Sequence, residues 1–165
     1  MKRITVLMLI LMAKLTCAAT LTIEGLLTAP ALTPEPKRIC LINNGYIMEI
    51  HFGTIITDKI DGINYLTDVP LTLNCSGDNS FYPNEQLILK YDGTTASFTS
   101  DAVSTSVEGL GIKLQQNGET FRPGDSLIIS ETTIPELKAI PVKQPGKILA
   151  EGSFESFAVL VAEYE

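Results

Sequence analysis

Histidine is almost absent from this 165-residue sequence, which holds a single one, His51. A serine hydrolase triad needs a histidine between its nucleophile and a third, orienting group, and the sole histidine also argues against a metal site built with the cysteines. Asp58, Asp61 and Asp68 match no calcium-binding loop, and no glycine-rich phosphate loop is present. We therefore expect no catalytic residues, no metal site, no cofactor and no enzymatic activity.

Basic residues are also scarce, with 12 lysines and arginines against 19 aspartates and glutamates and a formal net charge of −7. Three of the 12 basic residues and none of the acidic ones lie in residues 1–19, so the rest of the chain carries a net charge of −10. An acidic surface of this kind argues against binding to nucleic acid and to anionic membranes.

Long apolar runs are missing except at the start of the chain. There, MKRITVLMLILMAKLTCAA places Lys2 and Arg3 ahead of an apolar run that ends in small residues, as in a secretory signal peptide. We expect residues 1–19 to be removed by cleavage after Ala19. The run is too short for a membrane anchor and Lys14 interrupts it, so we expect no anchor. The remaining 146 residues suffice for one domain with its own core.

Cysteines are few, and removal of the signal peptide takes Cys17 with it, leaving Cys40 and Cys75. In an oxidising compartment an even pair usually forms one disulfide. This disulfide would close a loop of 35 residues and stabilise the fold by roughly 3–4 kcal/mol. The alternatives are a metal site or a catalytic pair, against which the single histidine argues.

Helical periodicity is missing as well, since no long segment repeats apolar residues at helical spacing. Short runs rich in β-forming residues alternate instead with turn signals, such as Asn-Asn-Gly at 43–45, Asp-Gly at 61–62 and Asn-Gly at 117–118. The expected strands are 20–31, 39–42, 46–53, 63–75, 87–91, 110–116, 126–130, 137–143 and a last run within 152–165. Pro70 predicts an edge or a bulge in its run. This pattern predicts a single all-β domain, an immunoglobulin-like β-sandwich.

The run YIMEIHFG shows the alternation of a strand with one buried face. Met48, Ile50 and Phe52 fall on one side, and Glu49 and His51 fall on the other. We expect the solitary histidine to be exposed to solvent.

Four stretches in a fixed order carry a family resemblance: ICLINNGYIMEIHFG, DGINYLTDVPLTLNC, GLGIKLQQNG and LKAIPVKQPGKILAEGSFESFAVLVAEY. Gly152 is fourteenth from the end and Tyr164 is next to last. In these features the sequence resembles the pilins, especially the minor subunits, of fimbriae assembled by the chaperone–usher pathway of Gram-negative bacteria. The likeness covers essentially the whole chain after the signal peptide, although His51, Ser156 and Phe157 depart from the family pattern.

The resemblance implies an all-β fold of a special kind, an incomplete immunoglobulin-like β-sandwich that a donor strand from another subunit completes. Residues 20–31 would be an N-terminal donor-strand extension and residues 32–165 the pilin domain. The side chains that alternate on one face of this extension, and would enter the neighbouring subunit, are Leu21, Ile23, Gly25, Leu27 and Ala29. The alternative is that the extension forms the first strand of its own sheet.

The C-terminal stretch, by the same resemblance, would border the acceptor groove and pair with a chaperone strand during transit. The residues expected in this role are Gly152, Phe154, Ala158, Leu160, Ala162, Tyr164 and Glu165. The carboxylate of Glu165 would be held by basic residues of the chaperone and so set the register, because a slip of one residue turns the apolar set outward. Periodicity alone favours an ordinary last strand of a closed sandwich, and the family register of Gly152 and Tyr164 reverses that preference.

The resemblance also implies a structural role, that of a minor pilin or adaptor in a fimbrium at the cell surface, exported through the periplasm. Such a subunit polymerises by donor-strand exchange and contributes to cell adhesion. Its partners would be a periplasmic pilus chaperone, an outer-membrane usher and neighbouring pilin subunits. The alternative function is that of a self-contained secreted β-sandwich, an adhesin or ligand-binding domain.

Overall fold

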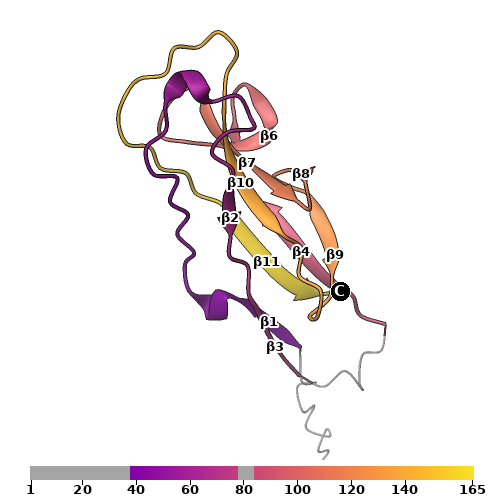
Figure 1. The fold of residues 1–165 in the computed structure, drawn as a ribbon. Helices are drawn as coiled ribbons and strands as arrows, with labels where there is room; N and C mark the ends of the chain where they lie inside the picture. Colours follow the sequence, from indigo (N-terminus) through magenta and orange to yellow (C-terminus); the bar gives the residue numbers. More distant parts are fainter. Residues whose placement is uncertain (1–37, 78–83) are drawn as a thin grey trace, which may run out of the picture. The chain divides into compact units, whose positions relative to one another are not determined.

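The computed structural model describes residues 38–77 and 84–165 (Figure 1). The strands are β1 (Ile39–Ile42), β2 (Thr67–Val69), β3 (Leu73–Ser76), β4 (Leu87–Asp92), β5 (Thr95–Ala96), β6 (Thr99–Ser104), β7 (Leu110–Gln116), β8 (Glu119–Phe121), β9 (Ser126–Ile129), β10 (Leu137–Lys143) and β11 (Val159–Tyr164). Two short 3-10 helices, η1 (Asn43–Gly45) and η2 (Thr57–Lys59), lie between β1 and β2. The all-β class predicted from the sequence is confirmed.

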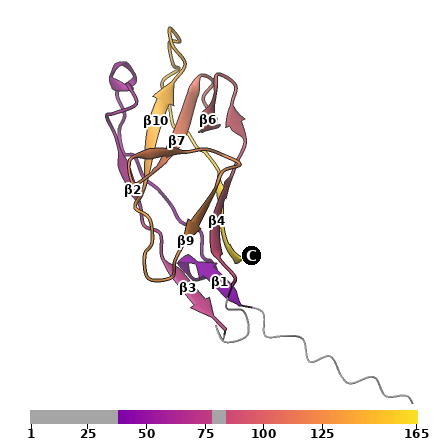
Figure 2. The same ribbon diagram turned by 90° about the vertical axis from the view of Figure 1, so that its right-hand side faces the viewer.

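The strands form three sheets, in which every neighbouring pair is antiparallel. The largest sheet has the order β2-β10-β7-β6-β5, with β8 added on β7, and Figure 2 shows β2, β10, β7 and β6 across it. The second sheet has the order β11-β4-β9, and β1 pairs with β3 in the third.

The core joins the two larger sheets through their alternating side chains. One buried cluster includes Leu87, Leu89 and Tyr91 of β4, Ile112 and Leu114 of β7, Leu137 and Ala139 of β10, and Ala162 of β11. Because side chains alternate between the faces of a sheet, each of these strands buries one face against the other sheet. The predicted β-sandwich is confirmed.

Two predicted turns are also confirmed. Asn117 and Gly118 have φ of 47° and 87° and join β7 to β8, with Gln116 opposite Glu119. Two positive φ values in a two-residue loop are the geometry that Asn-Gly favours in hairpins. The Asn-Asn-Gly at 43–45 likewise has positive φ throughout and turns the chain after β1.

The predicted strand at 63–75 is divided at Pro70, as its proline indicates. β2 ends before Pro70 and pairs with β10, whereas β3 begins after it and pairs with β1. The break therefore lets one run of sequence serve two sheets.

The predicted disulfide between Cys40 and Cys75 is confirmed. The two residues are opposite each other in the β1–β3 ladder. The bond therefore ties the first strand of the described domain covalently to β3.

Candidate strand-binding groove

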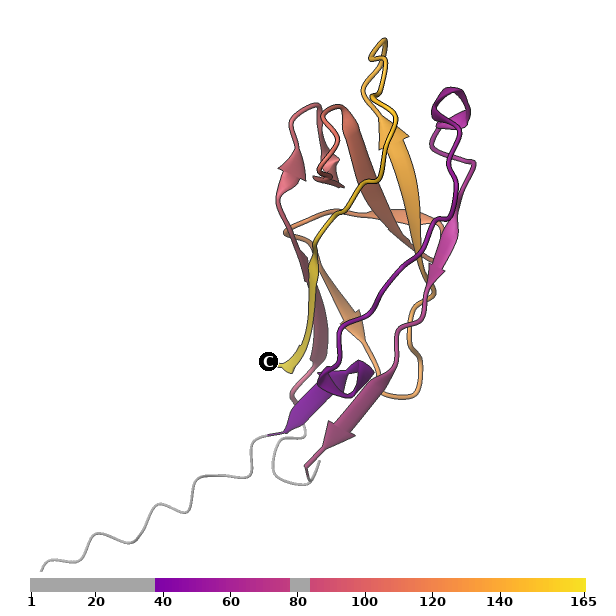
Figure 3. The same ribbon diagram turned by 90° about the vertical axis from the view of Figure 1, so that its left-hand side faces the viewer.

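A groove of about 960 Å³ opens between two segments that are far apart in the sequence. We call residues 40–52 the first lip and residues 154–162 the second lip, and Figure 3 shows β11 and the segment after β1 in one view. The floor between the lips consists of Val69, Tyr91, Val103, Ile112, Leu114 and Ala139. These residues come from both larger sheets, so the groove opens directly onto the sandwich core.

The first lip is extended but unpaired beyond β1. Among the described residues, no backbone–backbone hydrogen bond involves Ile47 to Ile55. The predicted alternation is nevertheless present, because Met48, Ile50 and Phe52 are half-buried against the core while the intervening Glu49 and His51 are exposed. Beyond β1, the first lip thus has the side-chain arrangement of a strand but lacks a ladder.

The second lip has one paired edge and one open edge. β11 pairs with β4 along its whole length, and no other strand of the described chain pairs with it. Leu160 and Ala162 turn inward, and Val159 and Val161 are exposed. Before β11, the lip is attached to the β6–β7 connection, where the Ser106 amide donates to the Glu155 carbonyl at 2.9 Å.

These two lips leave strand edges and apolar surface open to water. Ile47 is 89% exposed on the first lip and Phe157 is 81% exposed on the second. Unpaired strand edges are templates for pairing with another chain, and contiguous exposed apolar surface marks interaction sites. The geometry fits an extended segment whose backbone pairs with both lips and whose alternate side chains reach the floor.

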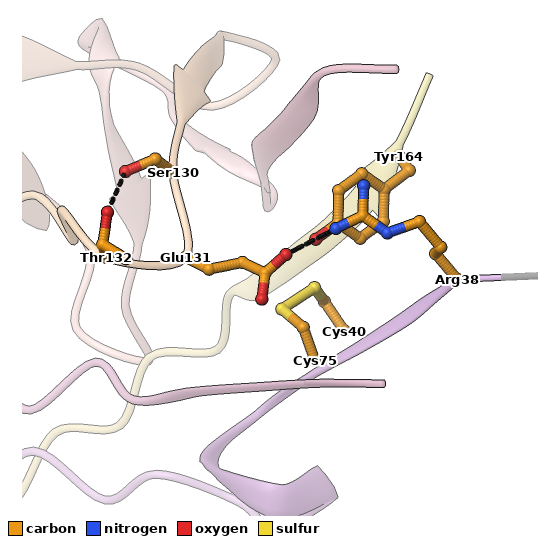
Figure 4. Close-up of polar contacts among 7 residues, drawn as sticks. All are labelled: Arg38, Cys40, Cys75, Ser130, Glu131, Thr132 and Tyr164. Atoms are coloured by element: carbon orange, nitrogen blue, oxygen red, sulfur yellow. Dashed lines mark hydrogen bonds and ion pairs between the residues drawn. A yellow bond between two sulfur atoms is a disulfide. The ribbon is translucent and has the colours of Figure 1, made fainter. Parts of the chain in front are cut away.

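The groove is bridged at both ends. At one end, the rings of Phe52 and Phe154 lie with their centroids 6.0 Å apart. At the other, Arg38 stacks on the Tyr164 ring, with Cζ 3.5 Å from the centroid, and contacts Glu131 at 2.5 Å (Figure 4). Burial, and secondarily the hydrogen bond to Glu131, raise the pKa of Tyr164 to about 12.

Comparison with known proteins identifies the family. The sequence model of the family described as "Fimbrial protein" matches residues 32–165. The chain belongs to the fimbrial protein family. A relative in Escherichia coli (strain K12), the uncharacterized fimbrial-like protein YfcQ, is 32% identical over 88% of this chain and 86% of its own length.

Solved pilus subunits share the fold of this pilin. The P pilus adaptor subunit PapF matches with a TM-score of 0.58 and 21% identity, covering 77% of this chain and 96% of PapF. The P pilus rod subunit PapA matches with a TM-score of 0.58 and 19% identity, covering 88% of this chain and 100% of PapA. The protein is a chaperone–usher pilin with a β-sandwich pilin fold, which places it in a fimbrium at the cell surface, reached through the periplasm.

The predicted site residues of the pilin fall into three groups. Phe154, Ala158, Leu160 and Ala162 line the groove. Gly152 precedes the second lip with a φ of 145°, a conformation that favours glycine. Tyr164 and Glu165 lie beyond the groove: Tyr164 contacts Arg38, and the backbone of Glu165 pairs with that of Gln86.

The predicted signal peptide and the predicted donor residues Leu21, Ile23, Gly25, Leu27 and Ala29 lie outside the described residues. Their roles therefore stay predictions.

The sequence alone did not identify two parts of the pilin's groove. The floor draws on strands up to 70 residues apart, from Val69 to Ala139, and no local pattern marks its members. Arg38 was also missed, because its contacts with Glu131 and Tyr164 join residues 93 and 126 positions away. The alternation after β1 was a usable signal for the first lip.

The other features considered in the described residues are the single histidine, metal-binding clusters and membrane-spanning helices. His51 is exposed, and its Nε2 lies 3.5 Å from the carboxylate of Glu49, whose side chain is also exposed. Within residues 38–77 and 84–165, no three His, Cys, Asp or Glu side chains are placed to hold a metal ion. No helix in this part of the chain is long and apolar enough to cross a membrane.

Proposed function

We propose that this pilin is a minor or adaptor subunit that is polymerised by donor-strand exchange. The groove accepts an extended segment from another subunit, and residues 20–31 form the segment that this chain supplies to its neighbour. The observation that carries the proposal is the pair of unpaired strand edges on either side of an apolar floor.

The energetics of insertion are favourable on this account. A donor with the pattern of residues 20–31 places Leu21, Ile23 and Leu27 against the floor, and burial of three such side chains at about 1.5–3 kcal/mol each gives about 5–9 kcal/mol. Hydrogen bonds to both lips add to this, and strand addition at an exposed edge is an established mode of recognition whose known examples include chaperone–pilin pairs. Gly25 stands where a side chain would meet the floor.

Three kinds of partner follow from this function. A periplasmic chaperone supplies a strand to the groove before assembly, and an outer-membrane usher receives the chaperone-bound subunit. One neighbouring pilin then supplies the strand that fills this groove, and another receives residues 20–31 of this chain. The adaptor position is the one that the family resemblance of the sequence implies, and from it the subunit contributes to adhesion by holding the fimbrium together.

The alternative function, a self-contained secreted β-sandwich, predicts paired or protected edges around the core. The exposed apolar side chains on both lips favour the donor-strand proposal over this alternative.

Adjacent residues of the extension provide a matched test. Leu27→Asp changes a side chain that faces the neighbour's groove, whereas Leu26→Asp changes one on the opposite face of the same strand. In cells that express the chaperone and usher, we expect both variants to co-purify with the chaperone and only Leu27→Asp to lose donation of its strand to the neighbouring subunit. Equal incorporation of the neighbour by both variants would contradict the proposal.

A further inference from the structure

One end of the groove is closed by a compact polar clamp made of Arg38, Glu131 and Tyr164. The Arg38 side chain is only 8% exposed, and its Nη2 lies 2.5 Å from both the Glu131 carboxylate and the Tyr164 hydroxyl. The Tyr164 hydroxyl also hydrogen-bonds Glu131. Figure 4 shows the guanidinium over the tyrosine ring with the Cys40–Cys75 disulfide nearby. Planar stacking and paired hydrogen bonds are interactions that arginine makes and lysine does not.

The clamp lies just beyond the point where the groove lining stops on both lips. The lining ends at Cys40 on the first lip and at Ala162 on the second. Arg38 is two residues before Cys40, and Tyr164 is two residues after Ala162. Since β1 pairs with β3 and β11 pairs with β4, the clamp links two sheets that share no ladder in the described chain.

The opposite end is closed by apolar contact alone. Phe52 of the first lip and Phe154 of the second lie with their ring centroids 6.0 Å apart. Phe154 also packs against the smaller buried cluster around Ile60. Phe52 and Phe154 carry no polar group in their side chains, so an apolar side chain that displaces their contact leaves no charge or hydrogen-bonding group unpaired. An apolar donor side chain that pushes into the clamp instead separates the largely buried Arg38 from its partners, and breaking a buried ion pair is costly.

The length of the groove between these two ends matches the length of the predicted donor segment. The second lip from Phe154 to Ala162 has nine residues, and so does the alternating set from Leu21 to Ala29. Nine extended residues span about 30 Å. A donor of this length has no spare room, so a shift of two residues, which keeps its apolar face inward, has to run past one end.

We propose that Arg38 is a positioning residue, the end stop of the acceptor groove, which sets the register of the inserted donor strand. This inference rests on the proposed donor-strand function. A slip of one residue is already excluded by the alternation of the donor. The clamp excludes the slip of two residues in its direction, and it does so without touching the central part of the groove.

Register can be measured by disulfide trapping. The mature chain carrying Val161→Cys, an exposed position on the second lip, is refolded with four synthetic peptides of the sequence of residues 20–31. Each peptide has one cysteine in place of an outward-facing residue, which is Thr22, Glu24, Leu26 or Thr28. With Arg38 present, we expect one peptide to cross-link about tenfold better than the others, equivalent to 1.4 kcal/mol of register preference.

The clamp variants then test the inference. In Arg38→Met we expect the peptide two positions away to cross-link within about threefold of the preferred one, a loss of at least about half of the tenfold preference on a logarithmic scale. Glu131→Gln, at a side chain that is 42% exposed, should shift the ratio in the same direction and serves if Arg38→Met does not fold. Arg122→Met is the matched control, because Arg122 pairs with Asp101 on the exposed surface away from the groove and should leave the tenfold preference intact.

The outcomes separate the inference from the function beneath it. An unchanged tenfold preference in the folded clamp variants overturns the role of Arg38 and leaves donor-strand binding standing. Failure of all four peptides to cross-link to the parent protein overturns the inference, which takes a segment with the sequence of residues 20–31 as the occupant of the groove, whereas the proposed function is tested separately by Leu27→Asp and Leu26→Asp. A preference that also collapses in Arg122→Met means that general destabilisation, and not the clamp, controls register, which overturns the inference alone.

Discussion

The strands β7 and β10 and the first lip share an alternation of inward apolar and outward side chains, yet their backbones differ in pairing. β7 and β10 pair along seven residues of each strand. The first lip repeats the alternation at Met48, Ile50 and Phe52, but Ile47 to Ile55 make no backbone–backbone hydrogen bond within the described chain. The side-chain pattern of a strand is therefore determined by the local sequence, whereas its backbone ladder depends on whether a partner strand lies beside it.

This contrast also predicts where stability is concentrated. Regions with buried side chains and complete ladders open last, and regions with exposed backbone open first. In this pilin, the first lip beyond β1 and the open edge of β11 expose backbone groups until a donor pairs with them. The following predictions use this difference, from the largest expected effect to the smallest.

The disulfide should have the largest effect, because it holds β1, from which the unpaired part of the first lip continues, covalently to β3. Replacing both Cys40 and Cys75 by serine should lower the free energy of unfolding by about 2–5 kcal/mol. Urea unfolding of the oxidised parent and of the double variant measures this. A variant as stable as the parent would mean that the β1–β3 ladder and the side chains of the first lip suffice without the disulfide.

Leucines in the two regions should respond differently to a donor. Leu89→Ala removes a fully buried side chain of the paired sheet and should cost about 2–5 kcal/mol of unfolding free energy with or without a donor peptide. Leu160→Ala, at the half-buried second lip, should cost less in the free protein and more once a peptide of the sequence 20–31 is bound. Urea unfolding with and without the peptide tests this, and a donor-independent cost at Leu160 would contradict it.

A buried tyrosine of the groove floor should make stability depend on alkaline pH. Burial raises the pKa of Tyr91 to about 12, against about 10 in an unfolded chain. Between these values the unfolded state binds fewer protons than the folded state, so stability falls as the pH rises from 10 toward 12.

The loss should approach about 1.4 kcal/mol per pH unit for Tyr91. Tyr91→Phe should reduce this slope and change stability little at pH 8. Tyr164, whose pKa is also raised to about 12, contributes with the same sign, so the slope should not vanish. Urea unfolding at pH 8, 10 and 11 measures the slopes, and equal slopes in the parent and in Tyr91→Phe would contradict the assignment.

The exposed pair of Arg122 and Asp101 should matter least. Both side chains are at least 40% exposed, and such pairs contribute about 0.2–1 kcal/mol. Arg122→Met should therefore lower the free energy of unfolding by less than Arg38→Met, whose arginine is buried between two partners. Thermal or urea unfolding of the two variants side by side checks the order, and the reverse order would show that the clamp is not a stabilising contact.

Much of the fold could be predicted from the sequence, because its strands are marked by alternation and bounded by turns. The runs that became β4, β7, β9 and β10 are apolar enough to be recognised, and Asn-Gly at 117–118 set the β7–β8 hairpin. β6 was missed because Thr99–Ser104 is mostly Thr, Ser and Asp, with only Ala102 and Val103 to be buried. Its strand state comes from pairing with β7, which a local pattern does not show.

The candidate site could be predicted in part. The alternation of Phe154 to Ala162 and of Met48 to Phe52 is local, so both lips could be read as strands. The sequence does not show that the two lips face each other without pairing, because their relative position is set by how the sheets of the sandwich pack together. The clamp is hidden for the same reason, since Arg38, Glu131 and Tyr164 lie on three separate elements.

The most direct test of the central claim is hydrogen–deuterium exchange of the backbone amides in the mature pilin, with and without a peptide of the sequence 20–31. Our account predicts that the peptide slows exchange at Ile47 to Gly53 on the first lip and within β11 on the second, while β7 and β10 change little. Unchanged exchange on both lips in the presence of saturating peptide, or protection of the first lip in the free protein as strong as in β7 and β10, would contradict it.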